Sequence, residues 1–187
     1  MTVIPLQFAR LRHHVRLEDE ARGAFIDRDF HQALRRAQSA QRLSPGCAHT
    51  RVLLGDILCG LGREAAALRS YHRARRLAPD SAEPYWSIST IHFLAGRFER
   101  ALRYLELAQA ELRRGDGPLY EWIAEDRALA LARLGRHREA LEAVRWGLRR
   151  RPRGTRLREL RAELTDAGRA RPRLRPVPSL SRRPVRD

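Results

Sequence analysis

Small residues that return at a fixed interval constrain this chain more than any other feature of its sequence. Four alanines spaced 34, 34 and 39 residues apart mark the interval: Ala33, Ala67, Ala101 and Ala140. A series of turn glycines keeps the last two of these spacings: Gly62, Gly96 and Gly135. A period of this size is typical of a stacked array of helical units.

Each unit of the repeat has the pattern of two helices joined by a tight turn. In the unit from Arg51 to Pro79, apolar residues recur at helical spacing over 52–61 and again over 67–77. Gly62 breaks the helix between these stretches, and Pro79 ends the second one because proline has no backbone N–H. A single hairpin cannot bury its apolar faces, so neighbours must stack. We therefore predict an all-α array of four hairpins at residues 14–47, 48–81, 82–115 and 121–154.

The hairpins resemble the tetratricopeptide repeat family, whose pattern runs W-x2-L-G-x2-Y, A-x3-F and P. The second hairpin matches this pattern best, through Leu54, Gly55, Leu58, Ala67, Tyr71, Ala74 and Pro79. The resemblance implies a right-handed superhelical array. It also implies that the first helix of each hairpin lines a concave groove and that the second helix forms the outer face. Members of the family mostly present surfaces to other molecules, so the resemblance is nearly silent about the partner.

The segments outside the hairpins have different predicted roles. Residues 1–13 are expected to fold over the first hairpin as a cover, and residues 155–168 to form a capping helix. The second helix of the third hairpin is predicted to run on to Arg114, with Gly115–Pro118 making the turn. Residues 169–187 are predicted to be disordered because they are rich in arginine and proline. The arginines of this tail are Arg169, Arg171, Arg173, Arg175, Arg182, Arg183 and Arg186.

Charge is distributed unevenly between the predicted helices. All 38 basic residues are arginine, and with 22 acidic residues they give a net charge of +16. The predicted first helices have a net charge of −3 and the predicted second helices +13, which predicts an acidic groove and a basic outer face. The expected groove residues are Glu18, Asp19, Arg22, Val52, Asp56, Glu83, Trp86, Ser87, Thr90, Trp122, Glu125 and Asp126. The two tryptophans either anchor a bound peptide or pack between adjacent first helices, and both alternatives stay open.

An acidic groove that contains tryptophan favours a cationic peptide or protein partner. The family's basic clamp for a peptide carboxylate is not matched, because Glu18 and Glu83 stand where cations are required. By the same logic of opposite charge, the Arg-rich tail of the chain could itself lie in the groove. The sequence thus indicates a non-enzymatic adaptor. The alternative is an accessory factor that docks on nucleic acid or a ribonucleoprotein through the arginines of its outer face and tail.

Other chemistry has little support in the sequence. Cys47, His49 and Cys59 form a metal-like grouping without a fourth ligand, so no metal site is predicted. There is no catalytic or phosphate-binding motif and no implied cofactor. Two cysteines do not make a disulfide framework. No stretch is apolar over the length of a bilayer, and the expected location is the cytoplasm.

Overall fold

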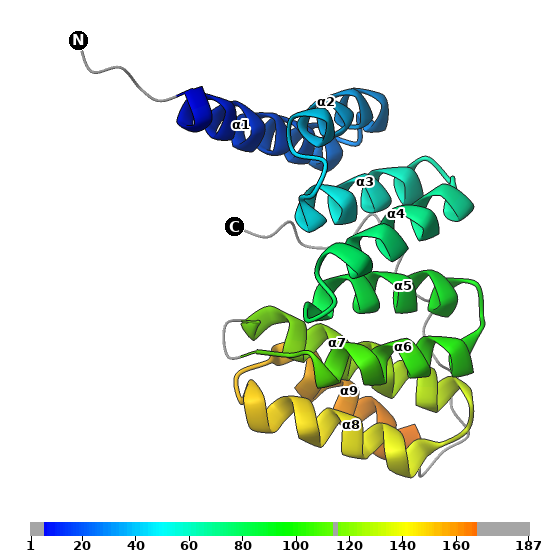
Figure 1. Ribbon diagram of the computed structural model, residues 1–187. Coiled ribbons are helices and arrows are strands. Elements are labelled where there is room, and N and C mark those ends of the chain that lie inside the picture. Colours follow the sequence, from blue (N-terminus) through cyan, green and yellow to red (C-terminus); the bar gives the residue numbers. More distant parts are fainter. Residues whose placement is uncertain (1–5, 114–115, 168–187) are drawn as a thin grey trace. The chain divides into compact units, whose positions relative to one another are not determined.

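The computed structural model describes residues 6–113 and 116–167, and within these ranges the chain is helical and contains no strand (Figure 1). In chain order the helices are α1 (Leu6–Ile26), α2 (Phe30–Leu43), α3 (Ala48–Gly60), α4 (Glu64–Leu77), α5 (Ala82–Leu94), α6 (Phe98–Ala110), α7 (Gly117–Arg133), α8 (His137–Arg150) and α9 (Thr155–Ala167). Consecutive helices pair as hairpins, α1 with α2, α3 with α4, α5 with α6 and α7 with α8. The prediction of an all-α helical-repeat fold is confirmed.

The chain divides into two compact units, the first ending at Pro79 and the second beginning at Asp80. In unit 1, α2 packs against α3, and α1 also touches α3. In unit 2, α6 packs against α7, α5 touches α7, and α9 lies on both α7 and α8. Each unit therefore buries its own apolar faces between stacked hairpins, as the repeat requires.

The turn inside every hairpin has one residue in the left-handed backbone region. In three hairpins this residue is Gly62, Gly96 or Gly135, with φ between 71° and 76°. In the first hairpin it is Arg28, with φ of 63°. For a residue with a Cβ atom, the left-handed conformation is about 1–2 kcal/mol less stable than the right-handed one. The first hairpin therefore has the same turn as the others, but its turn is strained at Arg28.

The contact between the two helices of the α3–α4 hairpin depends on a missing side chain at Gly55. A Cβ atom at this position would lie 2.2 Å from Cε1 of Tyr71, so the ring rests directly on the α3 backbone. Tyr71 is fully buried. One repeat later, 34 residues along, the same two positions hold Ser89 and Leu105, which are also buried. The aliphatic side chain leaves room for the serine that the tyrosine ring would exclude.

Residues 6–13 differ from the predicted cover, while residues 1–5 of that prediction lie outside the described residues. Helix α1 already begins at Leu6, so residues 6–13 continue the first helix instead of folding over it. Phe8 and Leu11 are 60% and 56% exposed, so their side chains do not cover the first hairpin. The extension is tied to α2 through Arg10, whose guanidinium donates to the Leu43 carbonyl at 2.8 Å. Residues 6–15 contain neither glycine nor proline, so nothing in this stretch of the sequence interrupts the helix.

The junction between α6 and α7 also differs from the prediction. Helix α6 ends at Ala110, four residues before Arg114, and the backbone N–H of Arg113 donates to Asp116 Oδ2 at 2.9 Å. This side-chain bond supplies an alternative to a helical partner and stops the helix. Pro118 lies in the first turn of α7, where its missing N–H costs nothing.

Helix α9 closes unit 2 with its apolar stripe, since Leu157, Leu160 and Leu164 are all buried. It occupies the position expected for the capping helix. The predicted tail at 169–187, including its seven arginines and its suggested place in the groove, lies outside the described residues and remains a prediction.

Candidate functional site

The twelve predicted groove residues are divided between the two units. Unit 1 holds those of α1 and α3, which are Glu18, Asp19, Arg22, Val52 and Asp56. Unit 2 holds those of α5 and α7, which are Glu83, Trp86, Ser87, Thr90, Trp122, Glu125 and Asp126. Four of the twelve are buried, namely Glu18, Val52, Trp86 and Ser87, and only Asp19 is exposed by more than about a third. A first-helix position is therefore not by itself a sign of an accessible side chain.

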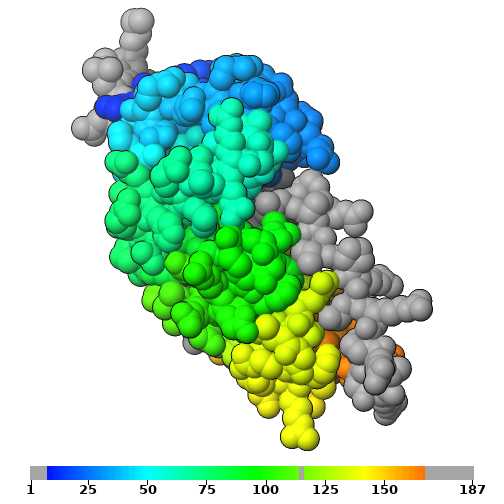
Figure 2. Space-filling view, turned by 90° about the vertical axis from the view of Figure 1, so that its right-hand side faces the viewer, coloured from blue at the N-terminus to red at the C-terminus, as the bar shows by residue number. Residues whose placement is uncertain are grey.

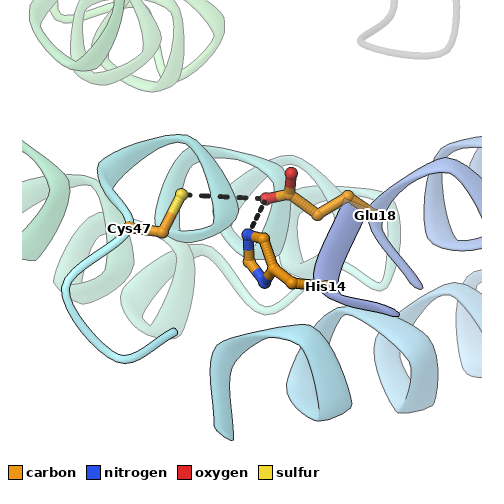
Figure 3. A group of neighbouring side chains, drawn as sticks. All are labelled: His14, Glu18 and Cys47. Atoms are coloured by element: carbon orange, nitrogen blue, oxygen red, sulfur yellow. Dashed lines mark hydrogen bonds and ion pairs between the residues drawn. The ribbon is translucent and has the colours of Figure 1, made fainter. Parts of the chain in front are cut away.

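In unit 1, Glu18 belongs to the interior. Its side chain lies between α1 and the start of α3, and the residue is only 9% exposed. Oε1 accepts a hydrogen bond from the Thr50 hydroxyl at 2.5 Å and lies 3.5 Å from His14 Nε2. The Cys47 thiol is 3.9 Å from the same oxygen, and Figure 3 shows Glu18 between Cys47 and His14. This carboxylate binds its own neighbours, which makes it a poor contact for a peptide.

The other charged residues of the unit 1 subset also have partners within the unit. The guanidinium of Arg22 is 3.5 Å from Asp19 and 2.7 Å from His49 Nε2. Asp56 accepts a hydrogen bond from the Tyr71 hydroxyl at 2.6 Å. Of this subset, only Asp19 combines a charge with high exposure.

In unit 2, the two tryptophans form a stacked pair that joins α5 to α7. The Trp86 and Trp122 rings are 5.1 Å apart at an angle of 19°. Trp86 is 8% exposed, and its Nε1 donates to Asp126 Oδ2 at 2.7 Å. Of the two alternatives left open by the sequence, packing between first helices describes Trp86. Trp122 is half-buried and keeps part of its surface accessible.

The closing helix supplies a cation to the same part of unit 2. The Arg156 guanidinium on α9 donates to Glu125 on α7 at 2.7 Å, and it lies 3.6 Å from Glu159 and 3.5 Å from Glu163. Burial alone would lower the pKa of Arg156, but the hydrogen bond to Glu125 and the nearby carboxylates outweigh it and raise the pKa. Glu125 is therefore neutralised from within the chain.

The helix bounds change the predicted charge balance of the first helices. In unit 1, α1 and α3 carry five arginines and four acids, a balance of +1, because α1 begins early and includes Arg10 and Arg12. In unit 2, α5 and α7 carry two arginines and four acids, a balance of −2. The predicted acidity of the groove side, −3 over all four first helices, thus falls to −1 and is confined to unit 2.

The second helices are basic, although less so than predicted. Over α2, α4, α6 and α8 there are 13 arginines and five acids, a balance of +8. In unit 2, the surfaces of α6 and α8, green and yellow in the space-filling view, adjoin each other (Figure 2). The balance is smaller than the predicted +13 because five of the arginines counted in the prediction lie outside the helix bounds, namely Arg63, Arg97, Arg113, Arg136 and Arg151, and Arg114 lies outside the described residues.

Cys47, His49 and Cys59, the grouping for which the sequence predicted no metal site, do not come together in the structure. Cys47 precedes the first turn of α3 and Cys59 lies in its last turn, so about 18 Å of helix separates them. A different trio meets instead, because the ligand atoms of His14, Glu18 and Cys47 all lie within 4.8 Å of one another. Part of this trio can be recognised in the sequence, because the four-residue spacing of His14 and Glu18 puts both side chains on one helix face. Cys47 lies 29 residues beyond Glu18, and no local pattern predicts that contact.

Across residues 6–113 and 116–167, no helix has both the length and the apolar character needed to cross a membrane.

Comparison with known proteins identifies the class to which this architecture belongs. The family model described as tetratricopeptide repeat matches residues 18–82 and 60–117, which together cover 100 of the 187 residues. The chain therefore belongs to the tetratricopeptide repeat family. Proteins of this family generally mediate protein–protein interactions, and the fold is typically not enzymatic.

Solved structures with the same fold are distant in sequence. The structure of pilF from Pseudomonas aeruginosa has a TM-score of 0.74 at 17% identity, covering 86% of this chain and 71% of that one. A crystal structure of MamA has a TM-score of 0.63 at 21% identity, covering 80% of this chain and 84% of its own. A second MamA structure has a TM-score of 0.60 at 20% identity, with coverages of 89% and 98%. No curated protein matches the sequence. At these identities the likeness establishes the fold alone.

Proposed function

We propose that this protein is a non-enzymatic interaction module that binds an extended peptide segment of a protein partner along α5 and α7 of unit 2. The observation that carries the proposal is the Trp86–Trp122 stack, in which one ring is buried and the other remains half-buried. Trp122 is thus held in a fixed orientation and offers an apolar surface without a large entropic cost on binding.

The charge around this surface favours a basic partner. Helices α5 and α7 have a balance of −2, of which Arg156 of α9 offsets one charge through its hydrogen bond to Glu125, and Glu83 and Thr90 are half-buried on α5. A preformed aromatic surface supplies burial, while nearby acids select charge and accelerate encounter. Unit 1 is a weaker candidate for this role because its first helices have a balance of +1 and its Glu18 is buried.

One experiment tests the proposal directly. The tagged protein is used to capture partners from its own lysate after nuclease treatment, and the retained proteins are mapped to a minimal basic peptide. Isothermal titration then compares this peptide on the native protein, on Trp122→Ala and on Trp146→Ala. Trp146 is the matched control, since it is also half-buried but lies on α8, where it packs near Tyr120.

The proposal predicts that Trp122→Ala weakens peptide binding at least about tenfold, whereas Trp146→Ala leaves the dissociation constant unchanged. Equal affinities for the native protein and Trp122→Ala would refute it. Circular dichroism confirms that each variant is folded before the titrations are compared.

The second candidate function is docking on nucleic acid or a ribonucleoprotein, and the balance of +8 on the second helices favours it. Binding of this kind depends on phosphate contacts and weakens steeply with salt. If nuclease treatment removes nearly all captured proteins, and if replacing Arg145 and Arg149 of α8 by glutamine lowers RNA affinity while Trp122→Ala does not, this candidate replaces the first. Removal of 169–187 tests whether the tail contributes to either activity.

A further inference from the structure

The contact between α1 and α3 contains three side chains of the kinds that bind transition metals. His14 and Glu18 stand four residues apart on α1, and Cys47 lies at the start of α3. Two ligands at this spacing on one helix face are a common way to hold a zinc ion. The third ligand comes from a different helix, so an ion bound here would join two elements of unit 1.

The distances suit an ion of that class. With bonds of about 2.0–2.3 Å and tetrahedral angles, the ligand atoms around zinc are about 3.3–3.7 Å apart. In this trio His14 Nε2 is 3.5 Å and Cys47 Sγ is 3.9 Å from Glu18 Oε1, and all three ligand atoms lie within 4.8 Å of one another. A modest rotation of the thiol closes the remaining difference.

The surroundings of the trio hold its ligands in a suitable orientation. His14 Nδ1 lies 3.1 Å from the Ala40 carbonyl, and since a carbonyl only accepts, Nδ1 must carry the proton. In the neutral ring the Nε2 lone pair then points toward Glu18, as in metal sites where a second partner fixes the imidazole. The Thr50 hydroxyl donates to Glu18 Oε1, the proposed ligand oxygen, and orients the carboxylate while leaving that oxygen a second lone pair for the ion. His14 is 5% exposed and Glu18 is 9% exposed, so these two ligands are shielded from bulk water, whereas Cys47 is half-buried.

We propose that His14, Glu18 and Cys47 bind one divalent transition-metal ion of the zinc class, with a solvent molecule as its fourth ligand, and that this ion fastens α1 to α3. A set of one imidazole nitrogen, one carboxylate oxygen and one thiolate sulfur matches zinc better than the all-oxygen shells of magnesium or calcium. On binding, the thiol releases its proton to solvent, and the sulfur forms a bond to the ion. The site is independent of the peptide surface proposed on unit 2.

The test uses the untagged full-length protein, freed of metal with a chelator under reducing conditions. Cobalt(II) is the spectroscopic probe, because a cobalt–thiolate bond gives a charge-transfer band in the near ultraviolet. Zinc chloride is then titrated by calorimetry and in competition with the bound cobalt. We expect one ion per chain, a thiolate band, and displacement of cobalt by zinc.

Two cysteine variants make a matched pair for this test. Cys47→Ser should weaken cobalt and zinc binding about 100-fold and abolish the thiolate band. Cys59→Ser removes the same chemical group from the other end of α3, and it should change neither the affinity for cobalt and zinc nor the thiolate band. His14→Gln should also weaken binding, whereas the exposed neighbour His13 can be replaced by glutamine without effect.

Thermal unfolding gives a readout that does not depend on the spectrum. Excess zinc should raise the melting temperature of the native protein and of Cys59→Ser, because the ion binds the folded state. It should not raise that of Cys47→Ser. The proposal is overturned if the native protein shows no saturable binding of one ion, or if the thiolate band depends on Cys59. In that case His14 and Glu18 form an ion pair with a proton in place of the metal.

Discussion

In unit 1 the junction of α1 and α3 contains a polar cluster beside its apolar side chains, whereas in unit 2 the junction of α5 and α7 contains an aromatic stack. Glu18 meets His14, Thr50 and Cys47 in the first case. Trp86 meets Trp122 and Asp126 in the second. The two junctions occupy equivalent places in the repeat, so the family framework fixes where neighbouring first helices approach but not the chemistry that joins them. A polar junction depends on protons and ions, while an aromatic junction depends on buried area.

The largest expected effect comes from breaking the aromatic junction. Trp86→Ala should lower the free energy of unfolding by about 3–5 kcal/mol, because it removes a large buried ring and leaves a cavity. Trp122→Ala should cost about 2 kcal/mol, since this residue is only half-buried. Chemical denaturation followed by circular dichroism measures both. Equal losses would mean that the two rings contribute equally and that the burial difference has no energetic consequence.

The next effect concerns the contact between the two helices of a hairpin, which pairs glycine with tyrosine in unit 1 and serine with leucine in unit 2. Gly55→Ser in unit 1 should cost about 3 kcal/mol, because the new Cβ collides with the Tyr71 ring. The reverse change in unit 2, Ser89→Gly, should cost only about 0.5 kcal/mol, the difference in helix propensity between serine and glycine. The double variant Gly55→Ser with Tyr71→Leu tests the explanation. It should recover most of the stability lost in Gly55→Ser, because Leu105 accommodates a serine at the same place in unit 2.

A smaller effect, of opposite sign, is expected at the turns. Arg28→Gly in unit 1 should raise the free energy of unfolding by about 1 kcal/mol, because it relieves a left-handed arginine. Gly96→Arg in unit 2 should lower it by a similar amount. Thermal melting of the two single variants measures both changes. If Arg28→Gly lowers the stability, the contacts of the Arg28 side chain outweigh the strain of its left-handed backbone.

The smallest expected effect is a pH dependence in unit 1. Burial, together with the charges of Arg75 and Arg76, lowers the pKa of His72 in the folded state. The unfolded chain then binds more protons than the folded one, so stability should fall as the pH drops below about 6.5, the ordinary histidine value. His72→Gln should flatten this part of the profile. A native profile that coincides with that of His72→Gln would contradict the direction of the shift.

The hairpins could be predicted because their signal is local and repeated. Gly62, Gly96 and Gly135 mark turns that the backbone requires, and the apolar spacing around them is helical. The early start of α1 escaped prediction because Phe8 belongs to an apolar stretch that resembles a cover for the core, yet its side chain is exposed. The end of α6 depends on a single hydrogen bond from the Arg113 backbone to Asp116, which composition does not reveal.

The candidate sites were harder to predict because they depend on pairs that are distant in the chain. Trp86 and Asp126 are 40 residues apart, and their hydrogen bond explains why Trp86 lies in the interior. Glu18 and Cys47 are 29 residues apart, and the only metal-like grouping visible in the sequence, Cys47 with His49 and Cys59, was rejected as a site. The sequence predicts that these residues lie on first helices. Whether a side chain is accessible depends on the residue that it contacts on the next first helix.

The unequal chemistry of the two junctions has a practical consequence for following how the array unfolds. All three tryptophans lie in unit 2 and both cysteines lie in unit 1. Intrinsic fluorescence excited at the tryptophan band therefore reports on unit 2 alone, while the reaction rate of the thiols with a labelling dye reports on unit 1 alone. Repeat arrays lose cooperativity when the coupling between neighbouring repeats is weak. Whether the two signals change at the same denaturant concentration measures how strongly the units are coupled, without a single substitution.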